Sequence, residues 1–258
     1  MKGHDKMKTD EIKAHWNASQ DERESRKRFV ELFRKCPIPE DELLMNLSLF
    51  FKRQDLSMLL FMNELYQKIL GVHGVVMEFG VRWGKNLALF ENFRGLYEPF
   101  NHNRKIIGFD TFAGFPSVNS KDGNEDIIQA GSFNVTEEYD DYLDQVLSYH
   151  EQESPIAHIK KYEIVKGDAS AQILKYLDEH PETIVALAYF DFDIYEPTLN
   201  CLKAISKRIT RGSVIGFDEL NVNRYPGETT ALTEVFGLDR YRIHHSIFSP
   251  TQSYIVIE

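Results

Sequence analysis

Four acidic residues stand where two apolar runs end in the second half of the chain. Asp191 and Asp193 end the run TIVALAYFDFD, and Asp218 and Glu219 end the run GSVIGFDE. Carboxylates are costly to remove from water, so acids at the ends of two buried strands are expected where a cation binds. Carboxylate oxygens are the ligands that hard divalent cations prefer. The pattern therefore favours a divalent metal site, although either pair could also be ordinary loop acids or helix caps.

These acids can act together only if the strands before them lie in one sheet. Residues 184–190 are apolar throughout, which is typical of a parallel strand that helices cover on both faces. From residue 74 onward, apolar runs alternate with helical patterns near residues 85–97, 172–179 and 198–209, which predicts a parallel sheet with right-handed crossovers. The last two runs, RYRIHHSIF and QSYIVIE, predict an antiparallel hairpin. We expect an α/β fold whose mostly parallel, seven-stranded sheet ends in that hairpin and carries both acid pairs at its carboxyl edge.

Two other strand ends carry residues suited to a nucleoside cofactor. Gly80, after the first strand, would let a ligand approach the backbone closely, and Asp110, which ends the second strand, could hold two ribose hydroxyls. The loop EFGVRWGKN lacks the complete GxGxxG pattern of a diphosphate site. The sequence thus predicts a nucleoside-bearing cofactor without a diphosphate, although Gly80 could also serve a plain strand-to-helix turn.

Composition limits the classes of partner. The chain has 258 residues, 42% of them hydrophobic and 27% charged, which suits one α/β domain with some additions. A net charge of −10 argues against a nucleic-acid partner, because such binding depends on Lys and Arg displacing counterions. We expect neither a signal peptide nor a membrane span. Cys36 and Cys201 form no zinc or disulfide pattern, which fits a cytoplasmic protein.

The N-terminal segment and one insertion lie outside this alternating pattern. Residues 40–70 are apolar on too many sides for a surface helix, so they either cover the domain core or form a subunit interface in a homo-oligomer. We therefore expect a helical extension over residues 1–70 and the catalytic domain over residues 71–258. The polar insertion over residues 116–160, with a helix near residues 137–150, is expected to cover the site as a lid.

Several motifs together resemble one enzyme family. They are, in order, VVMEFGVRWGKN, IIGFDTFAGFP, GSFNV, VKGDA, YFDFDIYEPT, VIGFDELN and YPGETTALTEVF. Over about residues 74–236 the chain resembles the macrocin O-methyltransferase (TylF-type) family of S-adenosylmethionine-dependent sugar O-methyltransferases. The resemblance implies a Rossmann-like class I methyltransferase fold, S-adenosylmethionine as cofactor and a bound Mg²⁺. It also implies, as acceptor, a glycosylated natural product or sugar nucleotide of antibiotic biosynthesis.

The resemblance implies roles for individual residues. Asp191, Asp218 and Glu219 would bind the metal, and Asp193 would be the general base that takes the proton of the acceptor hydroxyl. On an ideal strand Asp191 and Asp193 would share a face, because side chains repeat every second residue. The cofactor would contact residues at four strand ends, namely Glu78, Gly80, Asp110, Thr111, Asp168, Ala169 and Asp191.

Two features depart from the family pattern. The chain reads GVRWGKN where family members commonly read GVWRGG, so Arg82, Trp83 and Lys85 receive no role. Members also commonly carry two aspartates where this chain has Asp218 and Glu219. The longer glutamate must fold back or bind a metal through water.

Two other enzyme classes remain as alternatives. DFDIY is similar to the nucleophile motif of haloacid-dehalogenase-like phosphatases, with Asp191 as nucleophile and Asp193 as acid and base, but that motif normally opens its domain. A nicotinamide-dependent oxidoreductase would be expected to carry the complete GxGxxG motif, which this chain lacks, and hydride transfer does not require the acid cluster. In a methyltransferase, Tyr195, Arg224 and Tyr225 would line the acceptor pocket, with loop packing as the alternative for each.

Overall fold

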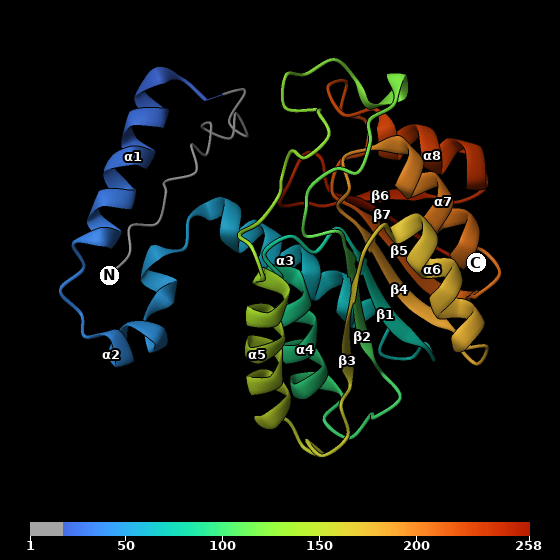
Figure 1. Cartoon of the computed structure of the whole chain (residues 1–258), viewed down its shortest axis with the longest axis horizontal. Helices are drawn as coiled ribbons and strands as arrows, with labels where there is room; N and C mark the ends of the chain where they lie inside the picture. Colours follow the sequence, from blue (N-terminus) through green and yellow to red (C-terminus); the bar gives the residue numbers. More distant parts are fainter. Residues whose placement is uncertain (1–17) are drawn as a thin grey trace. The chain divides into compact units, whose positions relative to one another are not determined.

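The second part of the chain folds around one seven-stranded sheet. The computed structural model describes residues 18–258, and the chain divides into two compact units, residues 1–56 and 57–258. The sheet lies in the second unit in the order β3-β2-β1-β4-β5-β7-β6 (Figure 1). Its strands are β1 (Val75–Phe79), β2 (Ile106–Asp110), β3 (Tyr162–Lys166), β4 (Val185–Phe190), β5 (Ile209–Phe217), β6 (Ile243–His245) and β7 (Ser253–Val256). β1 to β5 are parallel, and β7 runs antiparallel to both β5 and β6, which confirms the predicted sheet and hairpin.

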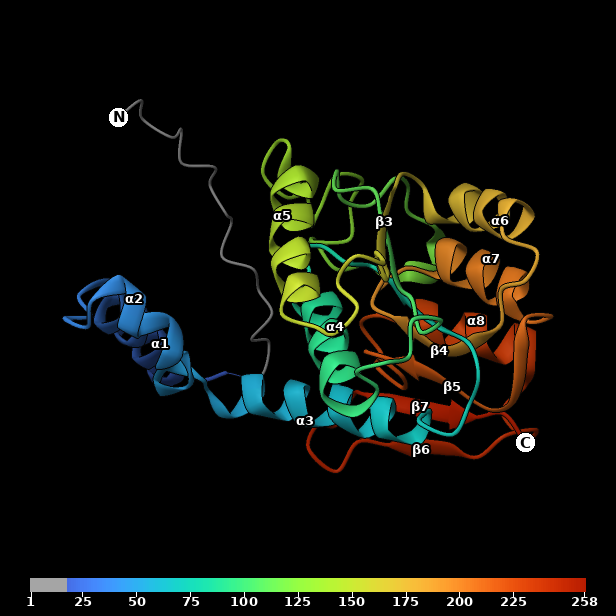
Figure 2. The same ribbon diagram turned by 90° about the horizontal axis from the view of Figure 1, so that it is seen from below.

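Helices cover both faces of this sheet (Figures 1 and 2). On one face, α3, α4 and α5 pack against side chains such as Val76 and Leu187. On the other, α6, α7 and α8 pack against side chains such as Met77 and Ala188. Neighbouring strand residues thus point to opposite faces and both are buried, which explains the uninterrupted apolar runs. The helices are α3 (Arg53–Lys68), α4 (Lys85–Tyr97), α5 (Tyr139–Gln152), α6 (Ala169–Glu179), α7 (Tyr195–Ile205) and α8 (Gly227–Phe236).

The strand register aligns the carboxyl ends of the four central strands. Phe79 pairs with Phe109 on one side and Phe190 on the other, with ring centroids 5.1 and 4.7 Å apart. Phe190 in turn pairs with Phe217, at 5.6 Å. These four phenylalanines form a continuous apolar row across the sheet, one residue before its carboxyl edge. The residues that directly follow them are Gly80, Asp110, Asp191 and Asp218.

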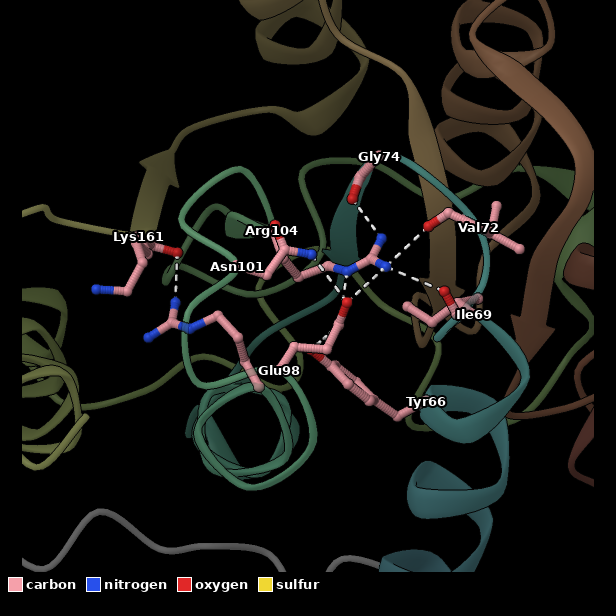
Figure 3. Close-up of polar contacts among 9 residues, drawn as sticks. Tyr66, Ile69, Val72, Gly74, Glu98, Asn101, Arg104 and Lys161 are labelled. Carbon is pink, nitrogen blue, oxygen red and sulfur yellow. Dashed lines mark hydrogen bonds and ion pairs between the residues drawn. The ribbon is translucent and has the colours of Figure 1, made fainter. Parts of the chain in front are cut away.

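The opposite edge of the sheet is fixed by a buried arginine (Figure 3). Arg104 donates to the carbonyl oxygens of Ile69, Val72 and Gly74, which follow α3. Its Nε also donates to Glu98, after α4, at 2.9 Å. One side chain thus satisfies backbone carbonyls that would otherwise be buried without partners. The contacts at this edge are structural, whereas the candidate site residues lie at the carboxyl edge.

The described part of the first unit is helical and has little core. It contains α1 (Gln20–Arg34), α2 (Glu40–Met45) and the 3₁₀ helix η1 (Leu47–Phe50), and none of their residues is buried. Ser19 caps α1 in a capping box with Glu22. The boundary near residue 56 divides the predicted extension, because residues of α3 such as Phe61 and Leu65 are fully buried in the second unit. Residues 1–17 of the predicted extension lie outside the described residues. Among those described, no helix is long and apolar enough to cross a membrane.

Candidate active site

The predicted acids of β4 and β5 meet at the carboxyl edge. The Asp191 N–H donates to Phe79 O at 2.8 Å, and the Asp218 N–H donates to Phe190 O at 3.0 Å, so the strand ends stay in register. Gly80 has a φ of +97°, and a Cβ there would come within 2.1 Å of Asp191 O. The glycine is therefore required by the close approach of the two strand ends.

Asp191 and Asp193 do not share a strand face, contrary to our expectation. β4 ends at Phe190, and Asp193 has a φ of +61° in the left-handed region. The two-residue repeat of a strand therefore does not reach Asp193. A left-handed backbone at a non-glycine residue persists only where its surroundings hold it.

The acids raise one another's pKa values. Burial, followed by the charge of Asp218, raises the pKa of Asp193 to about 7, and the cation of Arg82 acts in the opposite direction. Burial, followed by Asp218 and Asp193, holds the pKa of Asp191 well above its usual range. Burial, followed by Asp193 and Asp218, raises the pKa of Glu219 to about 10. A cluster of this kind would bind a cation or a proton favourably.

The donors present suit a magnesium ion, but they are not arranged as a finished metal cage. Glu219 Oε2 is buried without a hydrogen-bond partner among the described residues. Asp218 Oδ1 accepts from the hydroxyl of Tyr189 at 2.8 Å and from the amide of Gln252 at 2.9 Å, which fixes that carboxylate. Within residues 18–258, no three Asp, Glu, His or Cys side chains lie so that they could hold a metal ion together. The Mg²⁺ site therefore stays a prediction that the donor chemistry supports.

Glu78 is the predicted cofactor residue that is most free to receive a ligand. It is fully buried near the end of β1, and neither carboxylate oxygen makes a hydrogen bond of normal geometry among the described residues. Burial raises its pKa to about 8, while the side chain of Asn86 and the N–H of Leu87 lie close enough to act in the opposite direction. A buried carboxylate without a partner is costly, which suits a group that accepts hydrogen bonds from a ligand.

Three other predicted cofactor residues hold the backbone locally. Asp110 accepts from the N–H groups of Arg82 and Phe112, at 2.7 and 2.6 Å. The hydroxyl of Thr111 donates to Gly114 O at 2.7 Å. Asp168 is the N-cap of α6, and Ala169 is the first residue of that helix. Sequence analysis missed these backbone roles, and the cofactor contacts of the three residues stay predictions.

Comparison with solved structures identifies the family. A crystal structure of CalS11, a calicheamicin methyltransferase, is 42% identical with a TM-score of 0.89, and the match covers 93% of each chain. The apo structure of CalS11, described as a TDP-rhamnose 3′-O-methyltransferase, is 39% identical with a TM-score of 0.81 over 93% of this chain and 95% of that one. The chain belongs to the S-adenosylmethionine-dependent O-methyltransferase family of CalS11. This assignment excludes the phosphatase and oxidoreductase alternatives.

A more distant methyltransferase shares only the fold. The O-methyltransferase NovP is 16% identical with a TM-score of 0.59, over 78% of this chain and 79% of that one. No protein-family model matches this methyltransferase sequence, and no curated protein does.

Two cations of the methyltransferase that received no role from the sequence lie among its acids. Arg82 has a φ of +49°, and burial lowers its pKa against the opposing charges of Asp191, Asp193 and Asp110. Lys85 acts to lower the pKa values of Glu78 and Asp191. The sequence shows two cationic residues soon after the first strand. The direction in which their side chains point depends on the left-handed backbone at Arg82, which the sequence does not show.

The three predicted acceptor residues of the methyltransferase lie where the insertion meets the sheet edge. Tyr195 is buried, and its hydroxyl donates to Glu234 at 2.8 Å and accepts from Lys121 at 2.9 Å. Arg224 pairs with Glu125 of the insertion, at 3.5 Å.

Tyr225 belongs to a small apolar cluster with Phe115, Ile128 and Ile194. These contacts agree with the packing alternative, and the acceptor contacts stay predictions. The cluster places Ile128, within the predicted lid of residues 116–160, against Ile194 and Tyr225, which follow the acids of β4 and β5.

Proposed function

We propose that this methyltransferase moves the methyl group of S-adenosylmethionine to a sugar hydroxyl of a glycosylated natural product or sugar nucleotide in antibiotic biosynthesis. The observation that carries the proposal is the 42% identity to CalS11 over 93% of each chain. CalS11 is described as acting on TDP-rhamnose in calicheamicin biosynthesis. The free cysteines, Cys36 and Cys201, are consistent with a protein of the reducing cytoplasm.

The cofactor would lie across the ends of β3, β2, β1 and β4, which are consecutive in the sheet. This placement is supported by the unpartnered Glu78 carboxylate at the end of β1. The residues assigned to the cofactor are Glu78, Gly80, Asp110, Thr111, Asp168, Ala169 and Asp191.

Asp193 would be the general base. S-adenosylmethionine would supply the methyl group, losing its bond to sulfur as the acceptor oxygen bonds to the methyl carbon, and Asp193 would take the hydroxyl proton. Burial raises the pKa of Asp193 above its ordinary value, which suits this role, because a base works best when its pKa lies near the working pH. Holding the acceptor in line can itself lower the barrier by roughly 7–11 kcal/mol.

Asp191, Asp218 and Glu219 would hold Mg²⁺. When bound, the ion would supply charge that lowers the pKa of a coordinated sugar hydroxyl. The mutual repulsion of these buried acids and the unpartnered Glu219 oxygen support this assignment.

Methyl transfer to TDP-rhamnose is the first test of this function. The protein is incubated with S-adenosylmethionine and TDP-rhamnose, and then with a panel of nucleotide sugars and glycosides, and products are followed by mass spectrometry. We expect a product one methyl group heavier, together with S-adenosylhomocysteine. If no sugar in the panel is methylated while the cofactor binds, the acceptor class is wrong.

A separate test addresses the metal. Chelation by EDTA should abolish turnover, and added Mg²⁺ should restore it, because the acids lose their counter-charge when the ion is removed. Full activity of metal-stripped protein would exclude the magnesium role and leave the methyltransferase assignment intact.

A further inference from the structure

The first turn of α8 contacts both of the loops that carry the site acids. Glu228 lies in this turn and is fully buried. Its Oε1 accepts from the N–H of Phe192, at 3.3 Å, and its Oε2 accepts from the N–H of Glu219, at 3.2 Å. Phe192 stands between Asp191 and Asp193 in the sequence. One carboxylate thus joins the loop after β4 to the loop after β5.

The residues on either side of Glu228 reinforce this connection. The hydroxyl of Thr229 accepts from the N–H of Asn221, at 2.9 Å. A Cβ at Gly227 would lie 2.6 Å from Tyr195 N and 3.0 Å from Asp193 O, so the helix begins in direct contact with the backbone after the proposed base. Asp193 and Asn221 both have left-handed backbones, with φ values of +61° and +60°. Such conformations persist only where contacts hold them.

Packing alone does not account for a carboxylate at this position. Burial, followed by the charges of Asp193 and Asp218, raises the pKa of Glu228, and the two backbone N–H groups act in the opposite direction. An apolar side chain would fill the space without the electrostatic penalty. What it could not do is accept hydrogen bonds from two amides on two different loops.

We propose that Glu228 is a positioning residue, whose carboxylate holds the loops of Asp193 and Glu219 in the geometry needed for methyl transfer. The proposal rests on the roles given above to these two acids. Glu228 itself contacts neither cofactor nor acceptor in this proposal, and it acts through Phe192 and Glu219.

The Glu228→Gln variant tests this proposal, because glutamine keeps the shape but has only one acceptor oxygen. One of the two loop amides must then lose its partner. We expect amide hydrogen exchange at Phe192 or Glu219 to become about tenfold faster, and kcat with TDP-rhamnose to fall about tenfold or more. The KM for S-adenosylmethionine should stay within about threefold of wild type, since the loss concerns geometry at the acceptor.

Glu151→Gln is the matched control. Glu151 is also a buried carboxylate that accepts from a backbone N–H, that of Lys161 at 2.9 Å, but it joins α5 to the opposite edge of the sheet. It also pairs with the buried side chains of Arg94, at 3.0 Å, and Lys161, so its variant tests the effect of a large loss of stability away from the site. Its loss should lower the melting temperature and leave kcat and the exchange of Phe192 and Glu219 close to wild type. Glu228→Asp, which keeps the charge but is one methylene shorter, should fall between wild type and Glu228→Gln and serves if glutamine prevents folding.

Two results would overturn the proposal. The first is exchange and kcat in the Glu228 variants no different from those of Glu151→Gln. The second is faster exchange with unchanged kcat, which would mean that the loops need not be held. If wild-type protein methylates no sugar in the panel, the acceptor proposal fails, and unchanged exchange in Glu228→Gln would still overturn the role of Glu228.

Discussion

Asp191 and Asp193 are separated by a single residue, but their surroundings differ. Asp191 directly follows β4 and keeps the strand register through its N–H bond to Phe79. Asp193 lies beyond the strand in a left-handed conformation, near enough to Arg82 for the guanidinium to lower its pKa. The first position suits a fixed metal ligand, and the second suits a base that faces the acceptor.

Asparagine substitutions separate the two roles. Asp193→Asn keeps the shape and removes the proton acceptor, so kcat should fall by roughly 10²–10⁴-fold while S-adenosylhomocysteine binds as in wild type. Asp191→Asn should weaken Mg²⁺ instead, so that excess Mg²⁺ restores part of its activity. Calorimetric titration and steady-state kinetics measure both effects. If excess Mg²⁺ rescued Asp193→Asn and not Asp191→Asn, the two assignments would be reversed.

Arg82 should set the pH dependence of the base. Asp193 must be deprotonated to accept a proton, so kcat/KM should rise with pH and then level off. The nearby guanidinium favours the charged carboxylate, and Arg82→Gln removes it. The pKa of Asp193 should then increase and move the rising limb to higher pH.

Lys85→Gln provides the matched control for this profile. Lys85 lies near Asp191 and Glu78, and it does not contribute to the shift at Asp193. Its removal should leave the limb near its wild-type position. A limb that does not move in active Arg82→Gln protein would show that another group controls the profile.

At the scale of elements, sequence periodicity predicted the strands well and the helix starts less well. The apolar runs determine the central strands β1, β2 and β4, because these are buried on both faces. Residues 198–209 were predicted as a helix, but α7 is Tyr195–Ile205 and β5 begins at Ile209. The predicted helix began directly after Pro197, because proline breaks helix interiors, but proline is tolerated in the first turn of a helix.

The sequence predicted the acids of the candidate site but not the residues that hold or surround them. Acids at the ends of parallel strands meet because the register requires it. Glu228 could not be found in this way, since its partners are backbone amides of Phe192 and Glu219, which no sequence spacing reveals. The direction of Arg82 likewise depends on a positive φ that the residue type does not favour.

Asp122 connects the insertion to α7. It is buried in the short helix η2 (Ser120–Asp122), and it accepts from the N–H groups of Tyr195 at 2.6 Å and Asn119 at 2.5 Å. Asp122→Ala leaves the buried N–H of Tyr195 without this acceptor, at a cost of about 1–3 kcal/mol, and it also removes the acceptor of the half-buried Asn119 N–H. We expect faster proteolysis within residues 116–135 and a KM for the acceptor about fivefold higher or more, with cofactor affinity unchanged.

Asp144→Asn is the control for this prediction. It lies in the same insertion but removes only an exposed ion pair with Lys160, which contributes little to stability. Proteolysis and KM should stay close to wild type. Equal effects in the two variants would mean that Asp122 does not anchor the insertion specifically.

At the scale of the whole molecule, the described part of the first unit exposes an unusual amount of apolar surface. Leu44, Met45 and Leu49 are 72%, 80% and 63% exposed, and Leu32 is 63% exposed. No residue of α1, α2 or η1 is buried. So few residues cannot build a separate core, and exposed apolar helices tend to associate. We propose that this surface is covered by a second copy of the chain.

Light scattering on the purified protein should therefore report an oligomer at micromolar concentration, at least twice the chain mass of 30.0 kDa. A Leu44→Ser, Leu49→Ser double variant removes two apolar side chains from this surface and should shift the equilibrium toward the monomer, because symmetric association counts each loss in every subunit. The matched control is Leu174→Ser with Leu238→Ser, which removes two leucines that are 62% and 53% exposed in the second unit. That control should leave the mass unchanged, whereas a wild-type mass of a single chain would refute self-association through the first unit.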